Sequence, residues 1–161
     1  SFERRDADWH RECNSQAAWS EEVNEVFHAT VTREDGGFTI TFGGLNGVSF
    51  AESEADVPQR AHDLLASIFA MHIGEDDDLP RPSGGGDLPV RLDALTVAKI
   101  GLRLAMREEG TSGRALAARL GIAETALRRL LDLDHQSHIR QVEAALAALG
   151  RTLVADVSEA A

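Results

Sequence analysis

The sequence predicts an α+β protein with two small domains, and three observations lead to that prediction. Residues 26–51 alternate apolar and polar side chains, which is the period of a half-buried β-strand. From residue 95 onward the apolar side chains recur every three or four positions, which is the period of an α-helix. A serine and three glycines at residues 83–86 interrupt both patterns. We therefore predict four segments: an N-terminal extension (1–24), a sheet-and-helix domain (25–79), a linker with a possible strand (80–94) and an all-helical domain (95–161).

The extension is mostly polar, and Trp9, Cys13 and Ala17 lie four positions apart within it. That spacing fits a short amphipathic helix docked on the first domain. An extension that results from the choice of start site fits equally well.

A β-hairpin opens the first domain, and the sequence Asp35-Gly36-Gly37 favours a tight turn between its strands. Glycine-rich residues 43–47 then turn the chain into a third strand over residues 48–51. One face of the hairpin is expected to be buried, and it carries Phe27, Ala29, Val31, Phe38, Ile40 and Phe42.

An amphipathic helix follows the strands, and Ser53 and Asp56 are spaced as a capping box ahead of it. Pro58 would fall after that cap without an N–H to donate, so a later start with Asp56 as the cap is the alternative. A further strand is predicted over residues 88–92. The apolar positions of the helix are Val57, Ala61, Leu64, Leu65, Ile68 and Phe69.

Four helices are predicted in the second domain. One covers residues 95–109 and the last covers residues 138–149, which Gly150 ends. Two short helices lie between them, on either side of Gly121. A short strand is expected over residues 152–157, from its alternating apolar side chains.

Residues 111–131 carry the pattern of a helix-turn-helix DNA-binding motif. Apolar stripes on the two short helices are spaced to pack on each other across Gly121. The exposed face of the second helix would then meet base edges and phosphates. An ordinary helical hairpin with a solvated basic face is the alternative. The predicted DNA contacts are Ser112, Arg114, Glu124, Thr125, Arg128, Arg129 and Ser137.

Charge is divided unevenly along a chain whose net charge is −11. Residues 1–94 carry seven basic and 19 acidic side chains, so this half would repel nucleic acid and suits a basic partner, although plain solubility also explains it. Residues 95–131 are instead predicted to present a local cationic surface that attracts phosphate. Its members are Lys99, Arg103, Arg107, Arg114, Arg119, Arg128 and Arg129.

A single cysteine, Cys13, excludes an intramolecular disulfide framework. No apolar run has the length of a membrane span or the pattern of a signal peptide. We therefore expect a cytoplasmic protein without a membrane partner.

The order of these features resembles that of the HicB antitoxin family over residues 25–157. Similar features are a glycine-rich hairpin before Gly37–Phe42, a leucine and a glycine placed as Leu45 and Gly47, and a helix rich in alanine and leucine. A Pro-x-Pro-Ser element at residues 80–83 and the closing pattern LLDLDHQSHIRQVEAALAALGRTL complete the resemblance. The chain departs from the family pattern at Gly43, Gly44, Asn46 and Pro58.

The resemblance implies an N-terminal domain with a partial ribonuclease-H-like fold that binds and masks HicA, a small basic toxin that cleaves mRNA. It also implies that the C-terminal helix-turn-helix domain binds operator DNA of the protein's own operon. We expect a homodimer through that domain, or a higher oligomer, and no cofactor. The acidic residues that could face the toxin are Glu34, Asp35, Glu52, Glu54 and Asp56.

The residues leave two other functions as alternatives. A helix-turn-helix regulator with a small-molecule-sensing N-terminal domain would need a large apolar pocket in a small domain. A metal-dependent nuclease would need carboxylates on neighbouring strands, where the sequence offers histidine and threonines. His135 and His138 have a spacing that suits a metal, but with Ser137 they fit N-capping of the last helix better. We therefore predict neither an enzyme nor a metal site.

Overall fold

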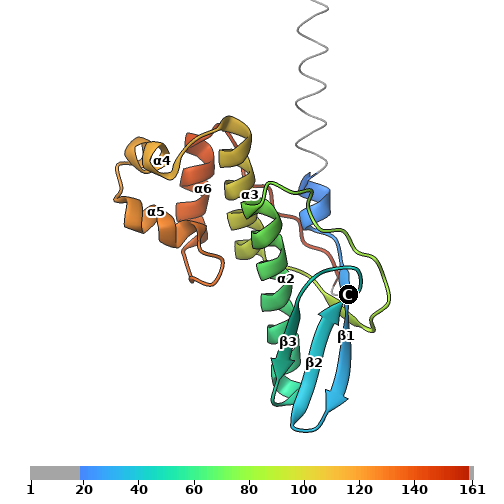
Figure 1. Ribbon diagram of the computed structural model, residues 1–161. Helices are drawn as coiled ribbons and strands as arrows, with labels where there is room; N and C mark the ends of the chain where they lie inside the picture. Colours follow the sequence, from blue (N-terminus) through green and yellow to red (C-terminus); the bar gives the residue numbers. More distant parts are fainter. Residues whose placement is uncertain (1–18, 160–161) are drawn as a thin grey trace, which may run out of the picture.

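The computed structural model describes residues 19–159, so the helix predicted around Trp9, Cys13 and Ala17 lies outside the described residues. The fold is mixed α/β, with a four-stranded antiparallel sheet at one end and helices gathered at the other (Figure 1). Residues 19–23 are helical. The elements that follow are β1 (Phe27–Glu34), β2 (Gly37–Phe42), β3 (Val48–Ala51), the 3-10 turn η1 (Glu54–Asp56), α2 (Val57–Gly74), β4 (Leu88–Val90), α3 (Ala94–Glu109), α4 (Gly113–Leu120), α5 (Glu124–Leu131) and α6 (Ile139–Ala148).

The sheet has the strand order β3-β2-β1-β4. Its hairpin is confirmed with a two-residue turn at Asp35 and Gly36, and Gly36 adopts a φ of 92° that glycine tolerates best. The strand predicted over residues 88–92 is confirmed over Leu88–Val90, where Val90 pairs with Phe27.

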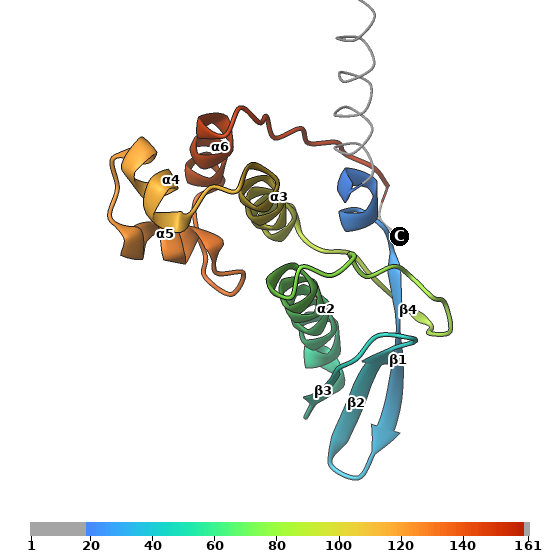
Figure 2. The same cartoon turned by 45° about the horizontal axis from the view of Figure 1, so that its top comes forward.

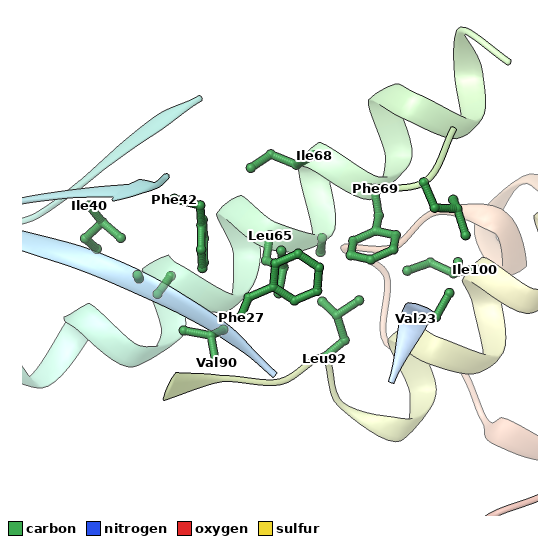
Figure 3. Close-up of a cluster of buried hydrophobic side chains, with 14 of the residues drawn as sticks. Val23, Phe27, Ile40, Phe42, Leu65, Ile68, Phe69, Val90, Leu92 and Ile100 are labelled. Carbon is green, nitrogen blue, oxygen red and sulfur yellow. The ribbon is translucent and has the colours of Figure 1, made fainter. Parts of the chain in front are cut away.

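A hydrophobic core lies between α2 and one face of the sheet, as the alternation predicted (Figure 3). The Phe27 ring meets the Phe69 ring edge to face, with 5.7 Å between centroids, and meets Phe42 in the same way at 6.3 Å. Ala29 is fully buried, whereas the threonines that alternate with it are exposed. The opposite face of the sheet has no helix on it within residues 19–159 (Figure 1).

The structure selects the later of the two predicted helix starts. α2 begins at Val57, with Asp56 as its N-cap residue and a proline in the first turn. The capping box is wrong, because the Ser53 hydroxyl donates to the Asp56 carboxylate at 2.6 Å and neither side chain caps a backbone N–H. The reason is that Ser53 precedes the 3-10 turn η1 instead of α2, and Asp56, the residue that does precede α2, has a helical backbone instead of the extended one that a capping side chain requires.

Helix α3 contributes side chains to two hydrophobic clusters. Ile100 and Leu104 belong to the core of the sheet, as Figure 3 shows for Ile100 beside Val23. Ala98, Leu102 and Ala105 belong to a second cluster with α4, α5 and α6. Both clusters therefore depend on the position of this helix.

The strand predicted over residues 152–157 is wrong. These residues are irregular, and Val154 and Val157 are 84% and 96% exposed. A strand needs a hydrogen-bonded neighbour, and this segment runs from α6 past α3 toward residues 19–24 instead of along a sheet edge (Figure 2). Alternating apolar side chains here therefore do not mark a strand.

None of the helices in the described part of the chain is long and apolar enough to span a bilayer.

The N-terminus of α3 is tied to α2 through a carboxylate and an imidazole. Asp93 caps α3 by accepting from the Thr96 backbone N–H at 2.9 Å, and its other oxygen lies 2.8 Å from Nε2 of His62 on α2. Burial raises the pKa of Asp93. The hydrogen bonds from Thr96 and the charge of His62 lower that pKa by more than burial raises it, so the net pKa lies below its ordinary value of 3.8. The ionised carboxylate is therefore the form that favours folding.

Replacing Asp93 with Asn should make the free energy of unfolding depend less on pH in the acidic range. A carboxylate with a lowered pKa contributes stability above its unfolded value and loses that contribution as the pH falls through its folded value. Wild type should therefore be more stable than Asp93→Asn near neutral pH, and the two should converge below about pH 3.8. Urea unfolding across this pH range measures the difference, with exposed Asp87→Asn as the control. Parallel stability curves for wild type and Asp93→Asn would contradict this role.

Candidate functional site

Helices α4 and α5 meet at a tight turn of three residues, 121–123. Gly121 has a φ of 66°, a left-handed conformation that ends α4, and the Ile122 N–H closes that end by donating to the Ala117 carbonyl at 3.1 Å. The two predicted apolar stripes are confirmed, because Leu116 and Leu127 are both buried in the second cluster. The pair packs on α6 as well as on α3.

The second helix of this pair turns a charged face outward. Glu124, Thr125, Arg128 and Arg129 are all exposed on α5, where the sequence placed them. Arg128 and Arg129 take part in none of the ion pairs found within residues 19–159. Their charges are therefore available to an outside partner.

The other predicted contact residues have local roles in the fold. Ser112 is the N-cap of α4, since its hydroxyl accepts from the Ala115 N–H at 3.1 Å. Arg114 lies 3.2 Å from Glu124, which joins the two helices across the outer face. Ser137 is wrong as an N-cap, because His138 occupies that position and the Ser137 hydroxyl instead lies 3.2 Å from the ring of His135.

The predicted cationic surface is smaller than the sequence indicated. Lys99 has no exposed area, so it contributes nothing to a surface. Arg107 pairs with Asp76 at 3.3 Å, and Arg119 pairs with Glu109 at 3.7 Å. Part of the expected basic charge is therefore neutralised within the fold.

Lys99 and Arg103 of α3 hold the C-terminal end of α5, in an arrangement that we name the α5 clamp. The Lys99 ammonium donates to the carbonyls of Arg129, at 3.4 Å, Asp132, at 2.6 Å, and His135. Arg103 Nε donates to the Leu131 carbonyl at 2.8 Å. These carbonyls form the negative end of the helix dipole or follow it directly, so two cations there are favourable.

Burial lowers the pKa of the Lys99 ammonium, and the nearby charge of Asp132 opposes that effect. The local pattern around Lys99 carries a signal for this role, which differs from the surface position predicted for it. A single lysine in the otherwise uncharged run from Val97 to Leu102 is typical of a buried, hydrogen-bonded cation rather than a surface charge.

Arg103 also lies next to the exposed arginines of α5. Together with Thr125, Arg128 and Arg129 it lines a hollow of about 480 Å³ on this face. Leu131 and Asp132 complete its lining. Three arginines from two helices thus share one concave surface with a single carboxylate, and arginine is the side chain best suited to binding phosphate oxygens.

The acidic residues that the sequence singled out gather at one end of the sheet. β1 and β3 are both antiparallel to β2, so their last residues lie at the same end, at the bottom of Figure 1. This end carries Glu34, Asp35, Glu52, Glu54 and Asp56, all of them exposed, and we name it the acidic end. It lies at the opposite end of the molecule from α5 (Figure 1).

No three histidine, cysteine or carboxylate side chains group to hold a metal ion anywhere in residues 19–159.

Comparison with known proteins places this chain among antitoxins. It is 36% identical over 103 residues to an Antitoxin HicB of Pseudomonas fluorescens (strain Pf0-1), covering 62% of this chain and 70% of that relative. It is 26% identical to Antitoxin HicB 2 of Photorhabdus laumondii, with 74% and 87% covered, and 25% identical to Antitoxin HicB of Escherichia coli (strain K12), with 74% and 88% covered. No family model matches the chain. The chain belongs to the HicB antitoxin family, and these relatives support an antitoxin role in a toxin–antitoxin system.

Replacing Lys99 with Met should destabilise the protein by about 2–4 kcal/mol, because it removes the buried ammonium that donates to three carbonyls at and just after the end of α5. Denaturant unfolding measures this change. Arg107→Met is the matched control, since Arg107 lies on the same helix and pairs with a highly exposed carboxylate. A Lys99→Met variant as stable as wild type would show that the α5 clamp does not support the fold.

Proposed function

We propose that this antitoxin has two binding surfaces with separate partners. The acidic end masks a small basic HicA-like toxin, an mRNA-cleaving ribonuclease, and α5 binds operator DNA to repress the protein's own operon. The observation that carries the proposal is the separation of charge: five exposed carboxylates at one end of the sheet, and exposed arginines on a distant helix. Neither role needs a catalytic group, and both place the protein in the cytoplasm.

The toxin would be neutralised by occlusion. A ribonuclease that binds RNA needs a basic surface, and a cluster of carboxylates presents a negative charge pattern that can take the place of the RNA backbone. The four-stranded antiparallel sheet with α2 on one face is consistent with a partial ribonuclease-H-like domain. Within this proposal the domain serves as a scaffold for the acidic end.

The operator would be bound by a helix-turn-helix made of α4 and α5, with α5 as the recognition helix. Thr125, Arg128 and Arg129 would face bases and phosphates, and the hollow beside Arg103 would seat a phosphate. A homodimer through the C-terminal domain would place two such helices roughly 34 Å apart, one turn of DNA. Ile122 and Ile139 are 36% and 40% exposed on this domain and would suit a contact between two copies.

Replacing Arg128 and Arg129 together with Ala should weaken operator binding and leave toxin inhibition intact. Loss of each contact should cost about 1–3 kcal/mol of binding free energy, and loss of phosphate contacts should flatten the dependence of affinity on salt. Fluorescence anisotropy with operator DNA at several salt concentrations measures both effects. Exposed Arg33 and Arg60, replaced together by Ala on the sheet domain, remove the same charge as a control. Unchanged operator binding in the folded α5 variant would rule out α5 as the recognition helix.

Neutralising three carboxylates at the acidic end should slow toxin association. In Glu34→Gln/Asp35→Asn/Glu52→Gln, the association rate at low salt should fall roughly tenfold, because charge steers the encounter. Stopped-flow mixing with the cognate toxin measures the rate, and the full chain is used because a fragment ending at residue 94 would lack Ile100 and Leu104 from the sheet core.

The control for this experiment removes the same charge elsewhere. Glu75→Gln/Asp77→Asn/Asp78→Asn alters exposed residues at the opposite end of α2. If both triple variants slow association equally, net charge and not the acidic end determines the rate.

A further inference from the structure

The acidic end contains an apolar hollow of about 390 Å³. It lies between the inner face of the sheet and the first turn of α2, and one carboxylate stands in its wall. The lining residues are Val31, Phe38, Glu54, Val57, Pro58 and Leu88.

The hollow lies where β4 begins at the edge of the sheet. Leu88, the first residue of β4, pairs with Ala29, so β1 pairs with no strand on that side beyond Ala29. Val31, Phe38 and Leu88 face the same side of the sheet as the fully buried Ala29 and Ile40, but they are only partly buried because they lie at the margin of the core. Apolar surface in three strands is thus left accessible beside charged residues.

We propose that this hollow is an anchor pocket for one apolar side chain of the basic toxin, with flanking lysines or arginines of the toxin paired to the acidic end. This inference rests on the proposed function and names the surface through which it acts. The hollow has the volume to take a leucine-, methionine- or phenylalanine-sized side chain. An apolar anchor surrounded by complementary charge is the usual arrangement of the residues that dominate a protein interface.

Charge complementarity identifies the occupant as a basic protein. Glu54 lines the hollow itself, and Glu34, Asp35 and Glu52 lie at the same end of the sheet. A second copy of this chain would bring its own carboxylates against these four, and like charges at that distance oppose association. A basic partner gains from the same charges.

The outer face of the sheet offers a different apolar surface and serves as the comparison. Val48 and Phe50 are 67% and 47% exposed there. The Phe50 ring lies over Gly37, where a β-carbon would collide with it, so this aromatic side chain already has a contact within the chain. The strand that carries Val48 and Phe50, β3, contains no acidic residue.

The test fills the hollow or places a charge in it. Val31→Phe occupies the space, and Leu88→Lys brings a cation where a lysine or arginine of the toxin would approach. Both variants should bind the cognate toxin at least tenfold more weakly than wild type in calorimetric titration, because hot-spot anchors carry most of an interface's energy. Val48→Phe and Val48→Lys, the matched changes on the outer face, should stay within about threefold of wild type.

Operator binding by each variant reports whether the fold survives, since α5 lies far from the strands that line the hollow (Figure 1). Val31→Phe should also leave the salt dependence of toxin binding unchanged, whereas Glu54→Gln should flatten it. A wild-type chain that does not bind the toxin overturns both this inference and the proposed function. If folded Val31→Phe and Leu88→Lys bind the toxin as tightly as the wild-type chain does, the anchor pocket alone is overturned. A loss of self-association in Val31→Phe without toxin would assign the hollow to a second copy and overturn it as well.

Discussion

The fold depends on α3 being held on two sides at once. One side inserts Ile100 and Leu104 into the core of the sheet, and the other packs Leu102 against the remaining helices. The helix is also tied down at its start, where Asp93 caps it and meets His62 of α2. A shift of α3 would therefore disturb both hydrophobic clusters, so the two halves of the chain are positioned by a single element (Figure 2).

The α5 clamp extends this control to the proposed recognition helix. Burying an ammonium costs free energy, and the carbonyls around Lys99 offset that cost only if α5 and the loop after it keep their place. An apolar side chain at this position could pack against α5 in more than one orientation of that helix. The buried lysine thus links the stability of the fold to the orientation of α5, which carries Arg128 and Arg129. A recognition helix must be held in a fixed orientation to enter the major groove.

Much of this arrangement could be predicted from local patterns. The alternation around Phe27, the turn at Gly36 and the stripes on α4 and α5 depend on residues near in sequence, and the structure confirms them. The strand over residues 152–157 and the surface position of Lys99 depended instead on what lies across the fold. The capping by Ser137 failed by a single residue, because the N-cap residue of α6 is His138. The acidic residues could each be predicted from the sequence, but their position at one end of the sheet follows from the strand order. The hollow beside them follows from the place where α2 begins.

We propose that the acidic end and α5 bind their partners independently, because α3 packs in both hydrophobic clusters and the two surfaces lie at opposite ends of the molecule. Native mass spectrometry of the full chain with the cognate toxin and an operator duplex tests it most directly. We expect a single species that contains chain, toxin and DNA together. Mutually exclusive complexes, with the toxin releasing the chain from DNA at every ratio, would contradict it.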